Sequence, residues 1–199
     1  RAYGLTVLGA VRKPLTARRL LEVVGLHRPV GPGRPAPAPD APGHRWEAAL
    51  RRGDVTVSLV PRVDLLAGRP AGLQARAWRG DADYGAADAA VELVDPAQHE
   101  IAASVAEHVL DVACEALLEI EDPVRGIDAT VIVPPAACSD LVLADRLAER
   151  ARAGGIDPRR LCLALPRRPR LHVSATQLDV LTRLRVRGFG LGLDGFEAG

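Results

Sequence analysis

The stretch RLCLALPRRPRL, residues 160–171, begins as an apolar run and ends in proline and arginine. Its first half is short and almost uninterrupted, which favours a buried β-strand. In α/β proteins the functional groups gather where such strands end. The stretch therefore predicts a strand followed by a cluster of positive charge made of Arg167, Arg168 and Arg170.

The segments on both sides of this strand have helical patterns. Ser174 and Gln177 are spaced as a capping box in front of residues 175–188. On the N-terminal side, Ser139 is expected to open a helix that ends at Gly154. The strand is thus predicted to lie between two helices.

The same alternation continues toward both ends of the chain. A long helix with Pro96 in its first turn is expected after Asp95. Gly68 is expected to turn the chain between the first two strands. Strands alternating with helices of this length predict right-handed βαβ units and a parallel sheet. The expected fold class is α/β, a partial (β/α)8 barrel with about five of its strands. Besides 160–166, the expected strands are 55–65, 70–78, 128–134 and 189–196.

Composition limits the classes of partner. The 199 residues are 48% hydrophobic and 26% charged, and the net charge is +1, so the chain can bury a core and shows no general preference for nucleic acid or membranes. It has no apolar run of about 18 residues and no signal peptide. Its three cysteines, Cys114, Cys138 and Cys162, match no zinc spacing. We expect a cytoplasmic protein with reduced, buried thiols, which binds neither membrane nor nucleic acid.

A proline-rich segment divides the chain into two parts. Residues 31–43, GPGRPAPAPDAPG, are typical of an extended linker between residues 1–30 and residues 44–199. The sequence opens at Arg1 inside a readable element, so we expect it to be a fragment of a longer protein. Before the linker, an apolar run ends at Lys13-Pro14 and a helical pattern follows.

This strand, Lys-Pro pair and helix resemble the end of a response-regulator receiver domain. In that family the lysine contacts the phosphorylated aspartate, so the resemblance implies this role for Lys13. An ordinary βα unit with a surface lysine would show the same pattern. The resemblance implies a place in two-component signalling.

Residues 44–199 resemble the EAL domain, the cyclic-di-GMP phosphodiesterase family. Three landmarks occur in the family's order. A basic helix leads into the first strand, VDLLAGRPAGLQAR takes the place of the strand with Glu-Ala-Leu, and LGLDGFEAG takes the place of the Asp-Asp-Phe-Gly-Thr-Gly signature. The resemblance implies a barrel that hydrolyses cyclic-di-GMP with two Mg or Mn ions.

Most of the family's metal-binding positions are changed in this chain. Gln74 replaces the glutamate of Glu-Ala-Leu, Arg76 follows it, and Asp194 is the aspartate that remains of the pair. Two divalent cations need several hard oxygen ligands. We therefore expect no metal cofactor and no hydrolysis. The other changed positions are Val60, Val133, Ala164, Arg167 and Gly195.

The arginines at the barrel mouth admit three interpretations. They form a solvated or ion-paired rim, they bind phosphate without a metal, or they belong to a nucleic-acid patch, which no interleaved aromatic residue supports. Asp194 is either a local hydrogen-bond partner or a ligand. The candidate ligand-binding residues are Arg76, Arg167, Arg168 and Asp194.

The sequence thus predicts a non-catalytic EAL-like module of a response regulator, which acts through a protein partner or dimerisation in cyclic-di-GMP or two-component signalling. One alternative is a metal-independent receptor for cyclic-di-GMP. The other is an active phosphodiesterase, which would require a different alignment of the metal-binding positions.

Overall fold

One mixed sheet organises the part of the chain that the computed structural model describes, which is residues 42–80, 86–120, 127–167 and 173–195. Its strands follow the order β1-β2-β4-β5-β6, and the short β3 pairs with β2 off this path. The strands are β1 (Val55–Asp64), β2 (Arg69–Arg79), β3 (Ala87–Asp88), β4 (Asp128–Ile132), β5 (Leu161–Pro166) and β6 (Gly190–Asp194). Lys13 and the first forty-one residues, with most of the expected linker, lie outside the described residues.

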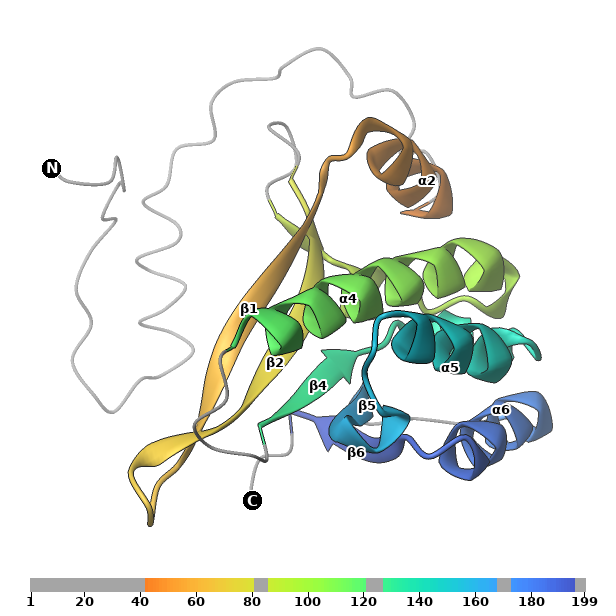
Figure 1. Cartoon of the computed structure of the whole chain (residues 1–199). Coiled ribbons are helices and arrows are strands. Elements are labelled where there is room, and N and C mark those ends of the chain that lie inside the picture. The colour runs from red at the N-terminus through yellow and green to blue at the C-terminus, as the bar shows by residue number, and fades with distance from the viewer. Residues whose placement is uncertain (1–41, 81–85, 121–126, 168–172, 196–199) are drawn as a thin grey trace, which may run out of the picture. The chain divides into compact units, whose positions relative to one another are not determined.

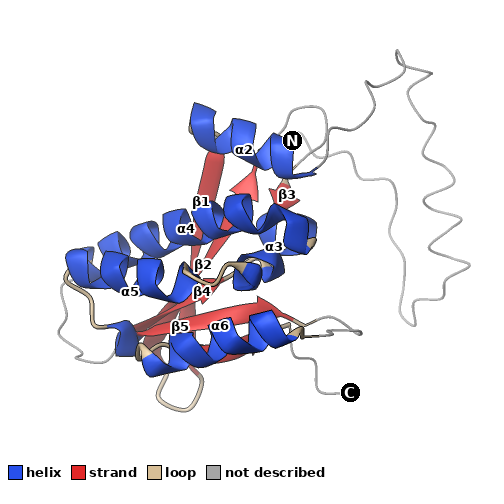
Figure 2. Cartoon of the chain, turned by 90° about the vertical axis from the view of Figure 1, so that its right-hand side faces the viewer, coloured by secondary structure: helices blue, strands red, loops and turns tan. Residues whose placement is uncertain are grey.

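Helices cover one face of this sheet (Figures 1 and 2). The α-helices are α2 (Pro42–Arg52), α3 (Ala89–Glu92), α4 (His99–Glu119), α5 (Leu143–Ala153) and α6 (Ala175–Val186). The short 3-10 helices are η1 (Pro96–Gln98), η2 (Pro135–Ser139) and η3 (Pro158–Arg160). The predicted α/β class, a partial barrel with five strands in succession, is confirmed. None of the helices in the described ranges has the length and apolar character needed to span a membrane.

The first two strands form a hairpin, so the expectation of a parallel sheet is wrong for β1. β1 and β2 pair antiparallel from Val55 opposite Arg79 to Asp64 opposite Arg69. The turn between them is too short for a parallel return, which needs a crossover of a dozen or more residues. Gly68 has a φ of +62° there, in the left-handed region that glycine adopts readily. From β2 onward, β4, β5 and β6 add in parallel.

The predicted helix ends agree with the structure at α6 but not at the start of α5. The Ser174 hydroxyl accepts a hydrogen bond from the Gln177 amide, and the Gln177 side chain accepts one from the Ser174 amide. Ser139 was expected to open a helix, but it ends η2, and α5 begins at Leu143. A proline at the first position favours a helical turn, so Pro135 starts η2 ahead of the main helix.

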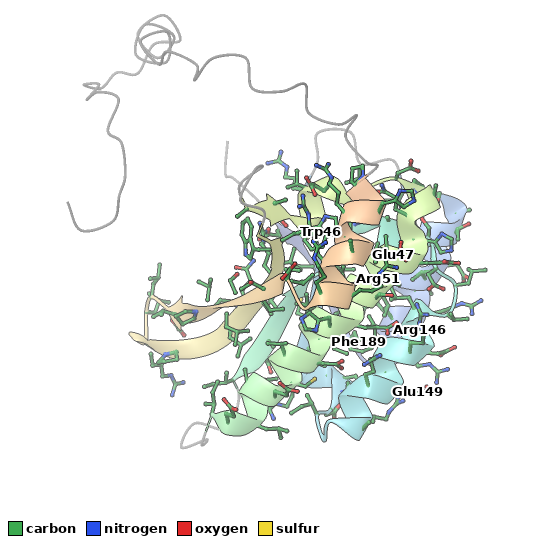
Figure 3. All side chains as sticks on the ribbon, turned by 90° about the horizontal axis from the view of Figure 1, so that it is seen from above. Trp46, Glu47, Arg51, Arg146, Glu149 and Phe189 are labelled. Carbon is green, nitrogen blue, oxygen red and sulfur yellow. The ribbon has the colours of Figure 1, made fainter. Side chains whose placement is uncertain are left out.

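The core lies between the helices and the facing side of the sheet. It consists mainly of alanine, leucine and valine, with Trp46 and Phe189 as its largest fully buried side chains. Trp46 points inward from α2, whereas Glu47 and Arg51 on the same helix form an exposed ion pair (Figure 3).

The cysteines are free thiols, as expected. Cys114 and Cys138 are buried, whereas Cys162 is only partly buried. Burial raises the pKa of Cys138 to about 12 and, with the neighbouring carboxylates of Asp111 and Glu115, raises the pKa of Cys114 to about 11. Because the thiolate is the reactive form, these two thiols are chemically inert at neutral pH.

Candidate functional site

The site forms on the face of the sheet that the helices leave uncovered, here called the inner face. Side chains alternate between the two faces of a strand. In β2, Leu73, Ala75 and Ala77 pack into the core, so Gln74 and Arg76 point to the inner face.

Arg76 is the centre of a polar cluster on this face. Its Nη1 donates to Asp88 Oδ2 at 2.8 Å, and its Nη2 donates to Asp194 Oδ2. Gln74 Nε2 donates to the other oxygen, Asp194 Oδ1, at 3.0 Å. The side chains of Arg76, Asp88 and Asp194 are 24%, 10% and 23% exposed, so water screens these charges only partly. One guanidinium between two carboxylates gives the cluster a net charge of −1.

The curvature of the sheet brings these residues together. β2 and β6 are separated by β4 and β5 in the sheet, yet Arg76 on β2 reaches Asp194 on β6. Small residues lie between them. A Cβ added at Gly192 would lie 3.2 Å from Cys162 Sγ and 3.5 Å from Ala164 Cβ, so a larger residue would crowd this part of the inner face.

Backbone hydrogen bonds also hold both aspartates of the cluster in place. Asp88 is the N-cap of α3, where its Oδ1 accepts a hydrogen bond from the Ala90 amide at 2.9 Å. The carbonyl oxygen of Asp194 accepts a hydrogen bond from the Arg167 amide at 2.8 Å, which ties the end of β6 to the residue after β5. The cluster therefore joins α3, β2, β5 and β6.

The residues present do not fit the pair of divalent cations that the sequence resemblance implies. In the described ranges, no three His, Cys, Asp or Glu side chains are grouped so that they could hold a metal ion. Gln74 directs its N–H, a donor, toward Asp194. Ala164 packs with Ile132 and Ala90 in a small apolar cluster. A guanidinium and aliphatic groups thus stand where oxygen ligands would be needed.

The position of Val133 tests the alignment of this chain with the metal-binding positions that the resemblance implies. The resemblance places a metal-binding amide at Val133, but this side chain is only 2% exposed and belongs to the main core. Its neighbour Ile132 lies instead with Ala164 on the other side of β4. A shift of one residue in the alignment would exchange one aliphatic side chain for another, so it would not restore a ligand.

The structure brings the side chains of two predicted site residues together and joins the backbone of a third, Arg167, to one of them. Arg76 and Asp194 are in direct contact. Arg167 is exposed just after β5, and Arg168 lies outside the described residues. Asp88 was not among the predicted site residues. Its one sequence signal was an aspartate before a short helix-forming segment, which predicts a cap but not a contact with Arg76.

Comparisons with solved structures show the same fold in EAL proteins. The chain is 20% identical to the PaMucR phosphodiesterase in a cyclic-di-GMP complex, with a TM-score of 0.62 over 78% of this chain and 64% of that one. It is 18% identical to the Xanthomonas citri FimX EAL domain in complex with cyclic-di-GMP, with a TM-score of 0.57 over 79% of this chain and 62% of that one. It is 14% identical to Bacillus subtilis YkuI in complex with cyclic-di-GMP and calcium, with a TM-score of 0.52 over 77% of this chain and 39% of that one.

The chain spans less than two thirds of the length of each of these three proteins. No curated protein matches it. The family model of the EAL domain matches residues 44–199, which include every described strand and nearly all of the described helical residues. This match covers most of the chain, and the chain therefore belongs to the EAL domain family.

Proposed function

We propose that this chain is a non-catalytic EAL module that acts through protein contacts in cyclic-di-GMP or two-component signalling. The observation that carries the proposal is the contact between Arg76 and Asp194. Asp194 is the one aspartate that remains of the family's pair, and both of its carboxylate oxygens accept hydrogen bonds from side chains of β2.

This arrangement opposes metal-dependent hydrolysis. A metal-assisted reaction uses cations to activate water and to stabilise the charge that develops on the phosphate. A cation approaching Asp194 would have to displace the Arg76 guanidinium and would be repelled by it at short range, in a site that water screens only partly. Few oxygen ligands remain to offset this repulsion.

The charge of the cluster also bears on the receptor alternative. Arg76 is already neutralised by Asp88 and Asp194, so the cluster as a whole repels a phosphodiester. Arg167 is exposed just after the end of β5. The PaMucR and FimX EAL structures are complexes with cyclic-di-GMP, and this supports a receptor as the second candidate. In this chain, a receptor would bind phosphate through Arg167 and its neighbour Arg168.

Protein contacts are supported by apolar side chains on the surface. The hairpin turn between β1 and β2 carries two of them, Leu65 and Leu66, whose side chains are almost fully exposed. Exposed apolar side chains grouped in this way are typical of surfaces that bind another protein.

We expect the full chain to show no hydrolysis of cyclic-di-GMP with Mg²⁺ or Mn²⁺, because the cations have too few ligands. Product formation is followed by chromatography, and an active EAL phosphodiesterase in the same buffer is the positive control. Metal-dependent turnover that disappears on Asp194→Ala would show that the proposed function is wrong.

Isothermal titration with cyclic-di-GMP distinguishes a module that acts through protein contacts from a receptor for cyclic-di-GMP. For a module that acts through protein contacts we expect no heat of binding at low salt, with or without Mg²⁺. A receptor would instead bind without metal, bind more weakly as salt is added, and lose affinity on Arg167→Ala. Arg52→Ala is the matched control, because Arg52 is exposed at the end of α2 and paired with Asp54.

A further inference from the structure

The Arg76 cluster spans the inner face of the sheet from β2 to β6. Two strands lie between β2 and β6, so no backbone hydrogen bond can join these two strands. The contacts of Arg76 and Gln74 with Asp194 join them through side chains. The contact of Arg76 with Asp88 adds the start of α3 to the same cluster.

We propose that Arg76 is a resident cation, which neutralises Asp88 and Asp194 and clamps β2 to β6 in the place of a bound metal. This inference rests on the proposed function in one respect, namely that the wild-type chain binds no metal at this site. Arg76 then has a positioning role. The side chain holds the curved sheet in shape and does not itself bind a ligand.

The two carboxylates make a cation necessary at this position. The two carboxylates contact different Nη atoms of the same guanidinium, so a single cationic group lies between them. At 10% and 23% exposure, their mutual repulsion is weakly screened. Removing one partner from a shielded ion pair leaves an uncompensated charge, which costs more than the pair itself contributes. Without Arg76, the carboxylates would separate and pull β6 away from β2.

The same reasoning predicts what can replace Arg76. In its absence, Asp88, Asp194 and the amide oxygen of Gln74, once that amide turns over, would offer hard oxygen donors to the vacated space. Calcium and manganese ions prefer such donors. A divalent cation should then supply the positive charge that the guanidinium supplied, and should stabilise the variant but not the wild-type protein.

Thermal unfolding of the full chain tests this proposal. For Arg76→Gln and Arg76→Ala we expect Tm to fall by about 5–10 °C. Millimolar Ca²⁺ or Mn²⁺ should recover most of this loss and leave the wild-type Tm unchanged. The Mn²⁺ electron paramagnetic resonance signal gives a second readout, because it falls when the ion binds. It should fall with the variants and not with the wild-type chain.

Three further variants make the test specific. Arg62 is the matched control, because it also lies on the inner face but donates to the neutral hydroxyl of Thr130. Arg62→Ala should therefore lower Tm without any recovery in Ca²⁺ or Mn²⁺. Adding Asp194→Asn to Arg76→Ala should abolish the recovery, and Arg76→Lys, which keeps the charge, should need no added cation.

The proposal is overturned if cations stabilise the wild-type chain as much as the Arg76 variants, or if the variants neither bind Mn²⁺ nor recover Tm. These outcomes are distinct from a failure of the proposed function, which the hydrolysis assay decides on the wild-type chain. A wild-type chain that does not hydrolyse cyclic-di-GMP, with Arg76 variants that do not respond to cations, would overturn the clamp alone.

Discussion

Gly72→Ala is expected to lower the free energy of unfolding by about 3 kcal/mol or more, because β2 and β4 approach too closely at this point for any side chain. A Cβ at Gly72 would lie 2.6 Å from the carbonyl oxygen of Asp128 in β4, well inside van der Waals contact. That oxygen belongs to the backbone, so no change of rotamer relieves the overlap. For a domain of this size the loss corresponds to a fall in Tm of about 6–12 °C.

The consequence extends to the site, since β2 joins the hairpin to the parallel strands through this pairing. If β2 shifts away from β4, Gln74 and Arg76 move with it and lose their position opposite Asp194. The Gly72→Ala chain should therefore also lose the contacts of the clamp.

Gly80→Ala is the matched control for this prediction. Gly80 follows the end of β2, and a Cβ there would meet no atom of the described residues within 4 Å. We expect its Tm to stay within a degree or two of wild type, as for other surface substitutions of this kind. Thermal and urea unfolding monitored by circular dichroism measure both variants. Equal stability of the Gly72→Ala and Gly80→Ala chains would show that β2 and β4 do not approach each other this closely.

The local elements could be predicted from the sequence because their signals are local. The strand predicted at 160–166 agrees with β5 to within one residue, and the Ser174–Gln177 capping box opens α6 as predicted. Ser139 failed as a helix start because the prolines at 134–135 form a turn of their own first. The antiparallel pairing of β1 with β2 depends on the short turn between them. The alternation of strands and helices elsewhere in the chain carries no information about the length of this turn.

Two residues of the candidate site were predicted from the sequence, but the contact between them was not. Arg76 and Asp194 were selected as separate candidates to bind a ligand, and the structure shows that they bind each other although 118 residues separate them in the chain. A single sequence carries no signal for such a contact, because it depends on the curvature of the sheet. Asp88 was missed for the same reason. Its role as a helix cap is local, but its contact with Arg76 is tertiary.

Trp46→Ala is expected to cost about 4 kcal/mol of stability, a fall in Tm of about 8–16 °C, because it removes the main anchor of α2. Trp46 is fully buried, and Ala49 is the other buried residue of this helix. The indole Nε1 donates to Glu92 Oε2 at 2.8 Å, and the Arg79 guanidinium lies 5.9 Å from the centre of the ring. Alanine would leave a cavity and remove the hydrogen bond to Glu92 together.

Two substitutions divide this loss into its parts. Trp46→Phe keeps most of the ring but loses the N–H donor to Glu92, so it should cost about 1–2 kcal/mol. Trp78→Ala removes the chain's other tryptophan, which is only partly buried on the inner face and donates to Ser58 Oγ at 2.8 Å. Because less apolar surface is buried there, its cost should be clearly below that of Trp46→Ala. Urea unfolding followed by far-ultraviolet circular dichroism compares all three without relying on tryptophan fluorescence.

Glu92 lies on α3, and the N-cap of that helix is Asp88. Loosening α2 should therefore weaken the Arg76 cluster as well. Equal losses of stability for Trp46→Ala and Trp78→Ala would contradict the packing of α2 on the core.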